Sequence, residues 1–220
     1  MNKPKIFIAC DTNNLTRVKK IINQTQSSKI KIGYKFGLEF MNSRNGRKFI
    51  SKLKNKIIFV DLKLNDTVNT MTSTVKALKD IKINYLTVHI SSGFAALKAV
   101  KKISGKTKII GVTTLTSLNN KDLKLIGYNK SVKNLVTHQA KLAKKANLDA
   151  LVCSPYEVRA VRKIFKKEII TPGVQMGKRN YDQKRSMEVK KVKSDWLVIG
   201  RAITKGNIKK NIQNLYNELR

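Results

Sequence analysis

Short apolar runs alternate with longer stretches of helical spacing along the whole chain. Runs of this length, rich in Ile and Val, are typical of buried strands, and the stretches between them are typical of amphipathic helices. The predicted strands are Lys5–Cys10, Lys29–Tyr34, Lys56–Asp61, Tyr85–Ile90, Lys108–Thr114, Ala150–Ser154, Glu168–Thr171 and Trp196–Gly200. The predicted helices are Leu15–Thr25, Gly46–Asn55, Asn69–Ile81, Gly93–Ile103, Val132–Ala146, Pro155–Lys166, Gln183–Val192 and Asn207–Leu219. Eight such units favour a closed (β/α)₈ barrel, with an open doubly wound sheet as the alternative.

The length and the composition predict one domain over residues 1–220. A chain of 220 residues reaches the lower end of what a full barrel requires, and no Pro- or Ser-rich linker divides it. No apolar stretch reaches the roughly 18 residues of a membrane span, and the first run is too short for a signal peptide, which predicts a cytoplasmic protein. Cys10 and Cys153 lack metal-type or CxxC spacing, so we expect reduced thiols.

The formal net charge is +34, from 47 Lys and Arg against 13 Asp and Glu. Such a charge taken alone indicates nucleic-acid binding. The lysines are spread through every segment, however, and aromatic residues make up only 6% of the chain. We therefore expect solvated helix faces with weak nonspecific binding at low salt. A nonenzymatic nucleic-acid-binding protein stays an alternative, and tight duplex binding that survives about 0.2 M salt would indicate it.

Polar residues lie at the ends of the predicted strands or just past them, with Lys31 within the second strand. A barrel builds its chemistry at the carboxyl ends of its strands because the loops there meet at one mouth. We expect these residues to converge. They are Asp11, Lys31, Asp61, Lys63, His89, Thr113, Thr114, Thr116, Ser154, Pro172, Gly173, Gly200 and Arg201. The two histidines, His89 and His138, are too isolated to predict a histidine metal site.

The segment DLKLND contains the most specific charge cluster. Asp61 follows the apolar residues 57–60, and Lys63 points to the same side if the extended conformation continues. Asp66 could simply cap the next helix. Two carboxylates around an ammonium can keep the lysine protonated, oppose an anionic substrate group and deliver a proton.

The segment VDLKLNDTVNTM closely resembles the signature of the orotidine 5′-phosphate decarboxylase family. The similarity continues in the same order through IACD, IKIG, LTVHISSG, GVTTLTS, LVCSPYE, TPGV and VIGRAIT. This resemblance implies a lyase that converts orotidine 5′-monophosphate (OMP) to UMP and carbon dioxide in pyrimidine synthesis. It also implies that no cofactor or metal takes part.

The resemblance further implies roles for the charged residues. Asp11 and Lys31 match residues that contact the ribose hydroxyls and extend the charged network. Asp61 would lie against the substrate carboxylate, and Lys63 would stabilise negative charge at C6 and protonate that carbon. Asp66 and Thr70 match residues that reach a neighbouring active site across a homodimer interface.

The remaining matches concern the base and the phosphate. Thr116 would meet the pyrimidine edge, with an ordinary loop threonine as the alternative. Gln183, Gly200 and Arg201 would hold the phosphate, and Met176–Tyr181 would form a phosphate loop.

Some positions depart from the family pattern. Gln175 replaces a common Arg, Asn65 a frequent His, and Thr67 with Val68 the usual Ile-Pro. These departures concern efficiency and loop detail more than reaction type.

The main alternative function is that of a magnesium-dependent decarboxylase or aldolase acting on sugar phosphates within the same suprafamily. Such enzymes place a carboxylate where this chain has Lys31, because a divalent cation needs anionic oxygen ligands. A rate abolished by chelator, together with indifference to OMP, would indicate it. An inactive barrel is a further alternative, against which the complete set of charged positions argues.

Overall fold

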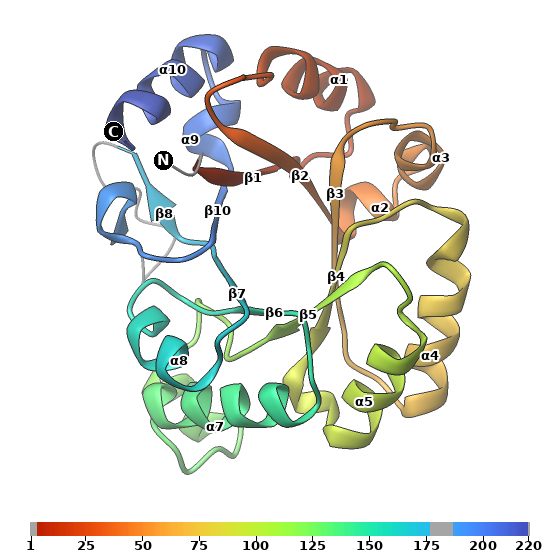
Figure 1. The fold of residues 1–220 in the computed structure, drawn as a ribbon, viewed down its shortest axis with the longest axis vertical. Helices are drawn as coiled ribbons and strands as arrows, with labels where there is room; N and C mark the ends of the chain where they lie inside the picture. Colours follow the sequence, from red (N-terminus) through yellow and green to blue (C-terminus); the bar gives the residue numbers. More distant parts are fainter. Residues whose placement is uncertain (1–3, 177–186, 220) are drawn as a thin grey trace.

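The computed structural model describes residues 4–176 and 187–219. Within them, parallel strands form a closed barrel in the order β1-β10-β7-β6-β5-β4-β3-β2 (Figure 1). Their bounds are β1 (Lys5–Ala9), β2 (Lys31–Gly37), β3 (Ile57–Leu64), β4 (Tyr85–His89), β5 (Lys108–Val112), β6 (Ala150–Val152), β7 (Glu168–Thr171) and β10 (Trp196–Ile199). The predicted (β/α)₈ barrel is confirmed, and the open sheet is wrong because β1 pairs with both β2 and β10.

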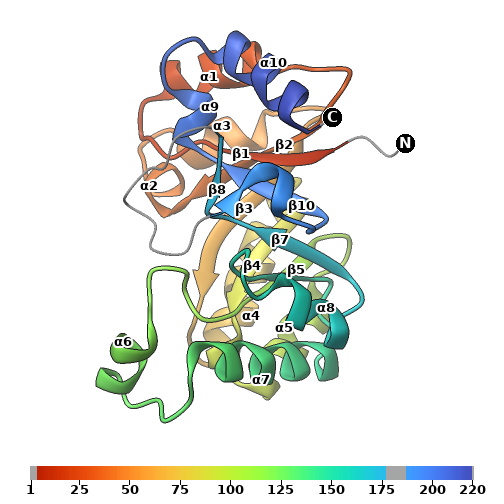
Figure 2. The same ribbon diagram turned by 90° about the vertical axis from the view of Figure 1, so that its left-hand side faces the viewer.

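Helices surround this barrel on its outer side (Figure 1). They are α1 (Leu15–Gln24), α2 (Leu38–Met41), α3 (Gly46–Ser51), α4 (Val68–Ala77), α5 (Phe94–Ile103), α6 (Asn120–Leu125), α7 (Val132–Lys145), α8 (Val158–Ile164), α9 (Arg201–Thr204) and α10 (Ile208–Glu218). Short 3₁₀ turns are η1 (Leu78–Asp80), η2 (Ile90–Ser92) and η3 (Val189–Lys191). Helix α6 stands away from the barrel, on the side opposite the N-terminus (Figure 2). No helix in the described ranges is both long and apolar enough to cross a membrane.

Helix α1 shows why these segments become helices. Asn14 accepts a hydrogen bond from the backbone N–H of Arg17, which satisfies one free donor at the helix start. Ile21 and Ile22 lie about one turn after Val18, and all three are buried, so the helix packs its apolar side on the barrel. The same arrangement leaves the lysines of the outer face in water.

The predicted helix Gln183–Val192 is wrong over its described part. Met187 and Glu188 form a short strand, β9 (Met187–Glu188), which pairs with β8 (Val174–Gln175), and a 3₁₀ turn follows. Backbone pairing with residues far away in sequence overrides the local helical preference here.

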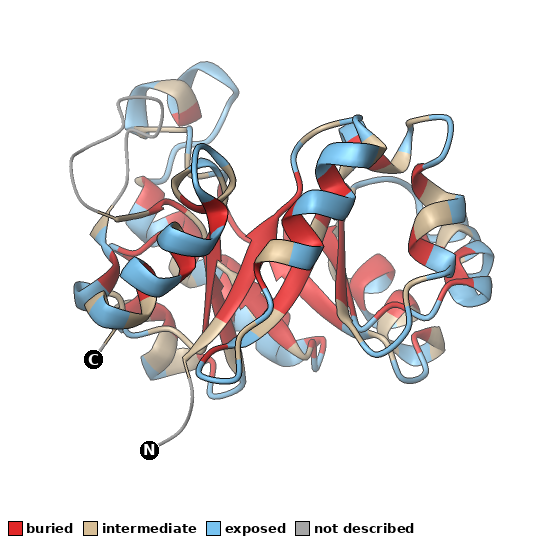
Figure 3. Cartoon of the chain, turned by 90° about the horizontal axis from the view of Figure 1, so that it is seen from above, coloured by how far each residue is buried: buried red, intermediate tan, exposed pale blue. Residues whose placement is uncertain are grey.

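Aromatic rings fill the barrel interior below its mouth. Phe7 stacks on Trp196 with ring centroids 4.1 Å apart and meets the edges of Phe59 and Tyr85. These rings belong to an interior cluster separate from the larger apolar layer between strands and helices. The strands are buried throughout the centre of the molecule (Figure 3). The barrel is therefore a packed core whose carboxyl end alone can carry the site.

The register of β2 decides which of its side chains reaches that end. Residues 31, 33 and 35 share one face, and Gly33 lies beside Phe7, whose ring occupies the space that a β-carbon at Gly33 would need. The strand continues to Gly37, three residues beyond its predicted end at Tyr34.

Candidate active site

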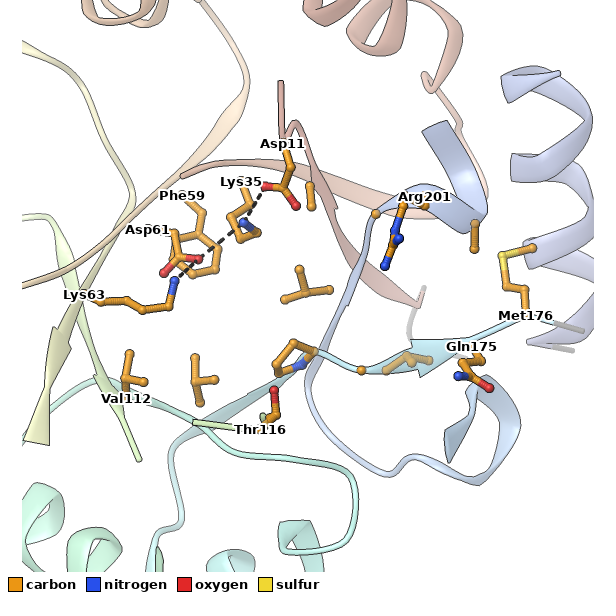
Figure 4. A pocket seen from close by; sticks show the side chains of 18 residues that line it. Asp11, Lys35, Phe59, Asp61, Lys63, Val112, Thr116, Gln175, Met176 and Arg201 are labelled. Carbon is orange, nitrogen blue, oxygen red and sulfur yellow. Dashed lines mark hydrogen bonds and ion pairs between the residues drawn. The ribbon is translucent and has the colours of Figure 1, made fainter. Parts of the chain in front are cut away.

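A cavity of about 320 Å³ opens at the carboxyl ends of the strands. Its wall includes Asp11, Lys35, Asp61 and Lys63 on one side and Arg201 on the other (Figure 4). Apolar residues of the strands, such as Phe59 and Val198, complete it from below. The cavity thus places a charged network above an apolar floor.

Four charged side chains form a continuous chain of ion pairs. The Lys35 ammonium lies 2.9 Å from Asp11 Oδ1 and 3.3 Å from Asp61 Oδ2. Lys63 Nζ lies 2.9 Å from the same Asp61 oxygen (Figure 4). The side chains of Asp61 and Lys35 are only 10% and 12% exposed, so solvent screens their interaction weakly. Negative and positive side chains therefore alternate along the network, from Asp11 through Lys35 and Asp61 to Lys63.

The pKa values of Asp61 and Lys35 are both shifted toward the charged form. Burial alone would raise the pKa of Asp61, but Lys35 and Lys63 outweigh burial, and the pKa lies below its ordinary value. Burial alone would lower the pKa of Lys35, but Asp61 and Asp11 outweigh it, and that pKa is raised. Asp61 is therefore a carboxylate and Lys35 an ammonium at neutral pH.

The expected position of Lys31 in this network is wrong. Lys31 is exposed at the amino end of β2, in register with Lys5, and β2 rises about 13 Å between residues 31 and 35. Both lysines lie on the inward face, but only Lys35 is near the mouth. Lys31 was chosen from the match to the family, whereas β2 runs three residues past its predicted end and brings Lys35 to the mouth.

Lys63 occupies an unusual backbone conformation. Its φ is +50°, in the left-handed region that non-glycine residues rarely adopt. The register between β3 and β4 shifts here, so the regular extended backbone assumed for Asp61 and Lys63 does not continue. The two side chains meet nevertheless.

Thr87 in β4 holds this irregular segment and was missed by the sequence interpretation. Its Oγ1 accepts a hydrogen bond from the Lys63 backbone N–H at 2.8 Å and donates to Asp61 Oδ1 at 3.0 Å. The signal available in the sequence was a threonine between Leu86 and Val88 within a predicted strand. The structure buries this threonine fully.

The opposite side of the cavity is suited to an anion. Thr116, Gly200 and Arg201 line it as predicted, and Gln175 does too. Gly200 and Arg201 also border a second hollow of about 290 Å³, whose wall includes Arg17 and Lys205. The predicted phosphate residue Gln183 and most of Met176–Tyr181 lie outside the described residues.

Comparisons with known proteins show the family of this chain. The model of the orotidine 5′-phosphate decarboxylase / HUMPS family matches residues 4–212. The chain belongs to this family. It is 40% identical over 220 residues to an orotidine 5′-phosphate decarboxylase of Wolbachia from Brugia malayi, covering 96% of each chain. It is 41% identical over 212 residues to the corresponding protein of Wolbachia from Culex pipiens, covering 92% of each.

Solved structures show the same architecture. An orotidine 5′-phosphate decarboxylase from Lactobacillus acidophilus superposes with a TM-score of 0.84 at 28% identity, covering all of both chains. The orotidine 5′-monophosphate decarboxylase of Methanocaldococcus jannaschii, complexed with inhibitor BMP, gives a TM-score of 0.81 at 23% identity with the same full coverage. The latter shows the fold alone.

Asp66 and Thr70 lie outside the cavity of their own chain in this member of the decarboxylase family. Both are exposed where α4 begins. Asp66 Oδ1 accepts a hydrogen bond from the Thr67 backbone N–H at 2.6 Å, and this bond, followed by one with Thr70, lowers the pKa of Asp66. Asp66 is thus an exposed carboxylate that does not line its own cavity.

The expected convergence of all strand-end polar residues is only partly correct. Pro172 and Gly173 line the cavity, whereas Thr113 and Thr114 are buried beside it. Thr113 donates to the carbonyl of Val152, Thr114 to Gln139, and Ser154 to Glu157. His89 also lies outside the cavity wall, where burial and then Lys63 lower its pKa. Thr113, Thr114 and Ser154 thus bond to other protein groups and do not line the cavity.

Proposed function

We propose that this chain decarboxylates OMP to UMP and carbon dioxide, without metal or cofactor, in pyrimidine synthesis. The observation that carries the proposal is the position of the Lys35 ammonium, 2.9 Å from Asp11 and 3.3 Å from Asp61. The network supplies both a buried carboxylate and a protonated amine to one cavity. Decarboxylation followed by protonation needs these two groups.

The cavity can orient an anionic nucleotide across its width. Arg201 and the backbone at Gly200 would bind the phosphate, helped by the positive field of Arg17 and Lys205. Asp11 and Lys35 would contact the ribose hydroxyls, and Thr116 would meet the base. Phosphate binding far from the reacting carbon can contribute to rate because it fixes the ring in place.

The reaction follows from the charges beside the pyrimidine. Asp61 would face the substrate carboxylate, and their repulsion disfavours the bound substrate relative to a transition state in which that charge is leaving. The bond from C6 to the carboxylate breaks and carbon dioxide departs. The electron pair of the broken bond stays on C6. The Lys63 ammonium stabilises that pair and donates a proton to C6, after which water reprotonates the amine.

The magnesium-dependent alternative fits the cavity less well. The Lys35 ammonium lies between the carboxylates of Asp11 and Asp61, where a divalent cation would have to bind. An ammonium there repels a metal ion and already neutralises its ligands. Lys35, not Lys31, is therefore the lysine that disfavours a metal ion in this cavity.

We also propose a homodimer in which Asp66 and Thr70 complete the partner's site. Both residues are exposed where α4 begins, as is Val68. A twofold interface over the start of α4 would place the same residues of each subunit at the other's cavity.

The reaction can be tested by following the absorbance of OMP with chelator-treated protein. Wild type should consume OMP in the presence of excess chelator. Lys63→Ala should lower kcat by at least about 10²-fold, because general acid catalysis contributes this much or more. Equal rates for the two proteins would remove Lys63 as proton donor, and activity that requires added Mg²⁺ would favour the metal-dependent alternative.

A further inference from the structure

We propose that Thr87 is a positioning residue for the reaction, because its hydroxyl fixes the geometry between the Asp61 carboxylate and the Lys63 ammonium. This inference rests on the proposed decarboxylation. Thr87 belongs to β4, whereas both charged residues belong to β3. It lies outside the cavity wall, so it would act through them.

The end of β3 departs from the regular ladder at these residues. Val60 is in register with Leu86, but the next paired residue, Leu64, is in register with Val88. Four steps along β3 therefore oppose two steps along β4. The segment between Val60 and Leu64 bulges, and a bulge can aim side chains at a site.

The Thr87 hydroxyl is placed to support this bulge. A hydroxyl has one proton to donate and lone pairs to accept with. Its proton points to Asp61 Oδ1 at 3.0 Å, which leaves a lone pair for the Lys63 backbone N–H at 2.8 Å. The donor and the acceptor roles of one oxygen thus connect two catalytic positions.

Both contacts are shielded from solvent. Thr87 is fully buried and Asp61 is 7% exposed, so water cannot easily replace the hydroxyl. Lys63 has a φ of +50°, which persists only when surrounding contacts hold it. Loss of the hydroxyl would let the Lys63 backbone relax toward the extended region.

The orientation of the carboxylate depends on the same contact. Asp61 Oδ2 receives both ammonium groups, at 2.9 Å from Lys63 and 3.3 Å from Lys35. Asp61 Oδ1 accepts the hydrogen bond of the Thr87 hydroxyl. Because each oxygen has its own partners, the plane of the carboxylate is fixed, and with it the side that would face the substrate.

The test compares Thr87→Val, which keeps the shape and removes the hydroxyl, with Thr87→Ser, which keeps the hydroxyl. Thr113→Val is the matched control. Thr113 is also buried, at the end of the neighbouring strand β5, and its hydroxyl bonds the Val152 carbonyl at 2.8 Å, outside the cavity wall.

Thr87→Val should lower kcat for OMP by about 10²-fold, the usual cost of displacing a reacting group by about 1 Å. KM should stay within about threefold, because other elements bind the phosphate and ribose. Thr87→Ser should keep kcat within about fivefold of wild type, and Thr113→Val within about twofold. Equal losses of kcat in Thr87→Val and Thr113→Val, in step with Tm, would reduce Thr87 to a structural residue.

A double-mutant cycle tests whether Thr87 acts through Lys63. In a Lys63→Ala background, Thr87→Val should lower the remaining rate by no more than about threefold, because the Lys63 ammonium is gone and only the contact with Asp61 is left to lose. A further loss as large as in wild type would overturn the proposal.

A crystal structure of Thr87→Val separates this inference from the proposed reaction. Lys63 should leave the left-handed region, and its ammonium should move away from Asp61. An unchanged local structure would overturn the positioning role whatever the activity. Failure of the wild-type protein to consume OMP would instead overturn the proposed function.

Discussion

Lys35 determines the charge balance of the site because it contacts both Asp11 and Asp61. Removal of one partner of a buried ion pair leaves the other charge poorly compensated, which typically costs about 3–5 kcal/mol. Lys63 still neutralises part of Asp61, and the exposed Asp11 can be hydrated. The lower end of that range therefore applies.

Lys35→Ala should lower kcat/KM for OMP by at least about 10²-fold and the free energy of unfolding by about 3 kcal/mol. Lys31→Ala is the control on the same strand and face, and it should change stability by less than about 0.5 kcal/mol. Steady-state kinetics and urea unfolding measure both effects. A larger loss of activity in Lys31→Ala than in Lys35→Ala would restore Lys31 to the site.

The pH dependence of Lys35→Ala follows from the same contacts. Burial raises the pKa of Asp61 and the two lysines lower it. Without Lys35, the Asp61 pKa rises, so the acid limb of kcat/KM should move to higher pH. In wild type, the lowered pKa of Asp61 in the folded state stabilises the protein. This stabilisation is present above the unfolded pKa of about 3.9 and is lost as the pH falls through the folded pKa.

Most of the charged residues of the site could be predicted from the sequence, but Lys35 and Thr87 could not. Asp11, Asp61, Lys63 and Arg201 were predicted to meet, and they line one cavity, because each lies within two residues of a buried strand. The choice between two lysines on one face depends on how far the strand continues. Thr87 was missed because its contacts depend on a bulge in a different strand.

At the scale of elements, the inward face of β2 is set by what fits against β1. A β-carbon at Gly33 would lie 2.6 Å from Phe7 Cε1 and 2.7 Å from Phe7 Cδ1. The Phe7 ring is itself held by Trp196 and Phe59, so it has little room to move.

Gly33→Ala should therefore destabilise the protein by about 1–3 kcal/mol, the usual cost of overpacking a filled core. Gly37→Ala is the control on the same strand, since its nearest contacts would lie at 3.7 Å. It should change stability by less than about 1 kcal/mol. Urea unfolding of the two variants compares them, and equal stabilities would show that the interior accommodates a methyl group beside Phe7.

The strands and most helices could be predicted because they bury apolar runs with regular spacing. The segment Met187–Lys191 could not, since the pairing of Met187 with Val174 determines its conformation. The position of Lys35 likewise depends on pairing between strands, since β2 continues beside β3 as far as Gly37.

At the scale of the whole molecule, the ends of the chain meet in the barrel wall. Ile6 of β1 is in register with Leu197 of β10, so the barrel cannot close without both ends. We propose that residues 1–220 form one domain.

The proposed dimer makes a prediction about mixed subunits. Lys63→Ala and Asp66→Ala should each be poorly active alone. In a heterodimer of the two, one site is intact, because it takes Lys63 from one subunit and Asp66 from the other. Random reassociation of an equal mixture should restore about a quarter of wild-type activity, since half of the dimers are then mixed and half of their sites intact.

The control mixture combines Lys63→Ala with Asp61→Ala. These residues contact each other within one chain, so no intact site can form. Activities are measured after the subunits are dissociated and reassociated together. Recovery in the control, or none in the Asp66 mixture, would contradict a site shared across the interface.

The stacked rings beneath the cavity make the barrel open at one end only. Phe7, Phe59, Tyr85 and Trp196 fill the axis on which a through-passage would have to run. In the proposed reaction, carbon dioxide would therefore have to leave by the same opening through which the nucleotide entered.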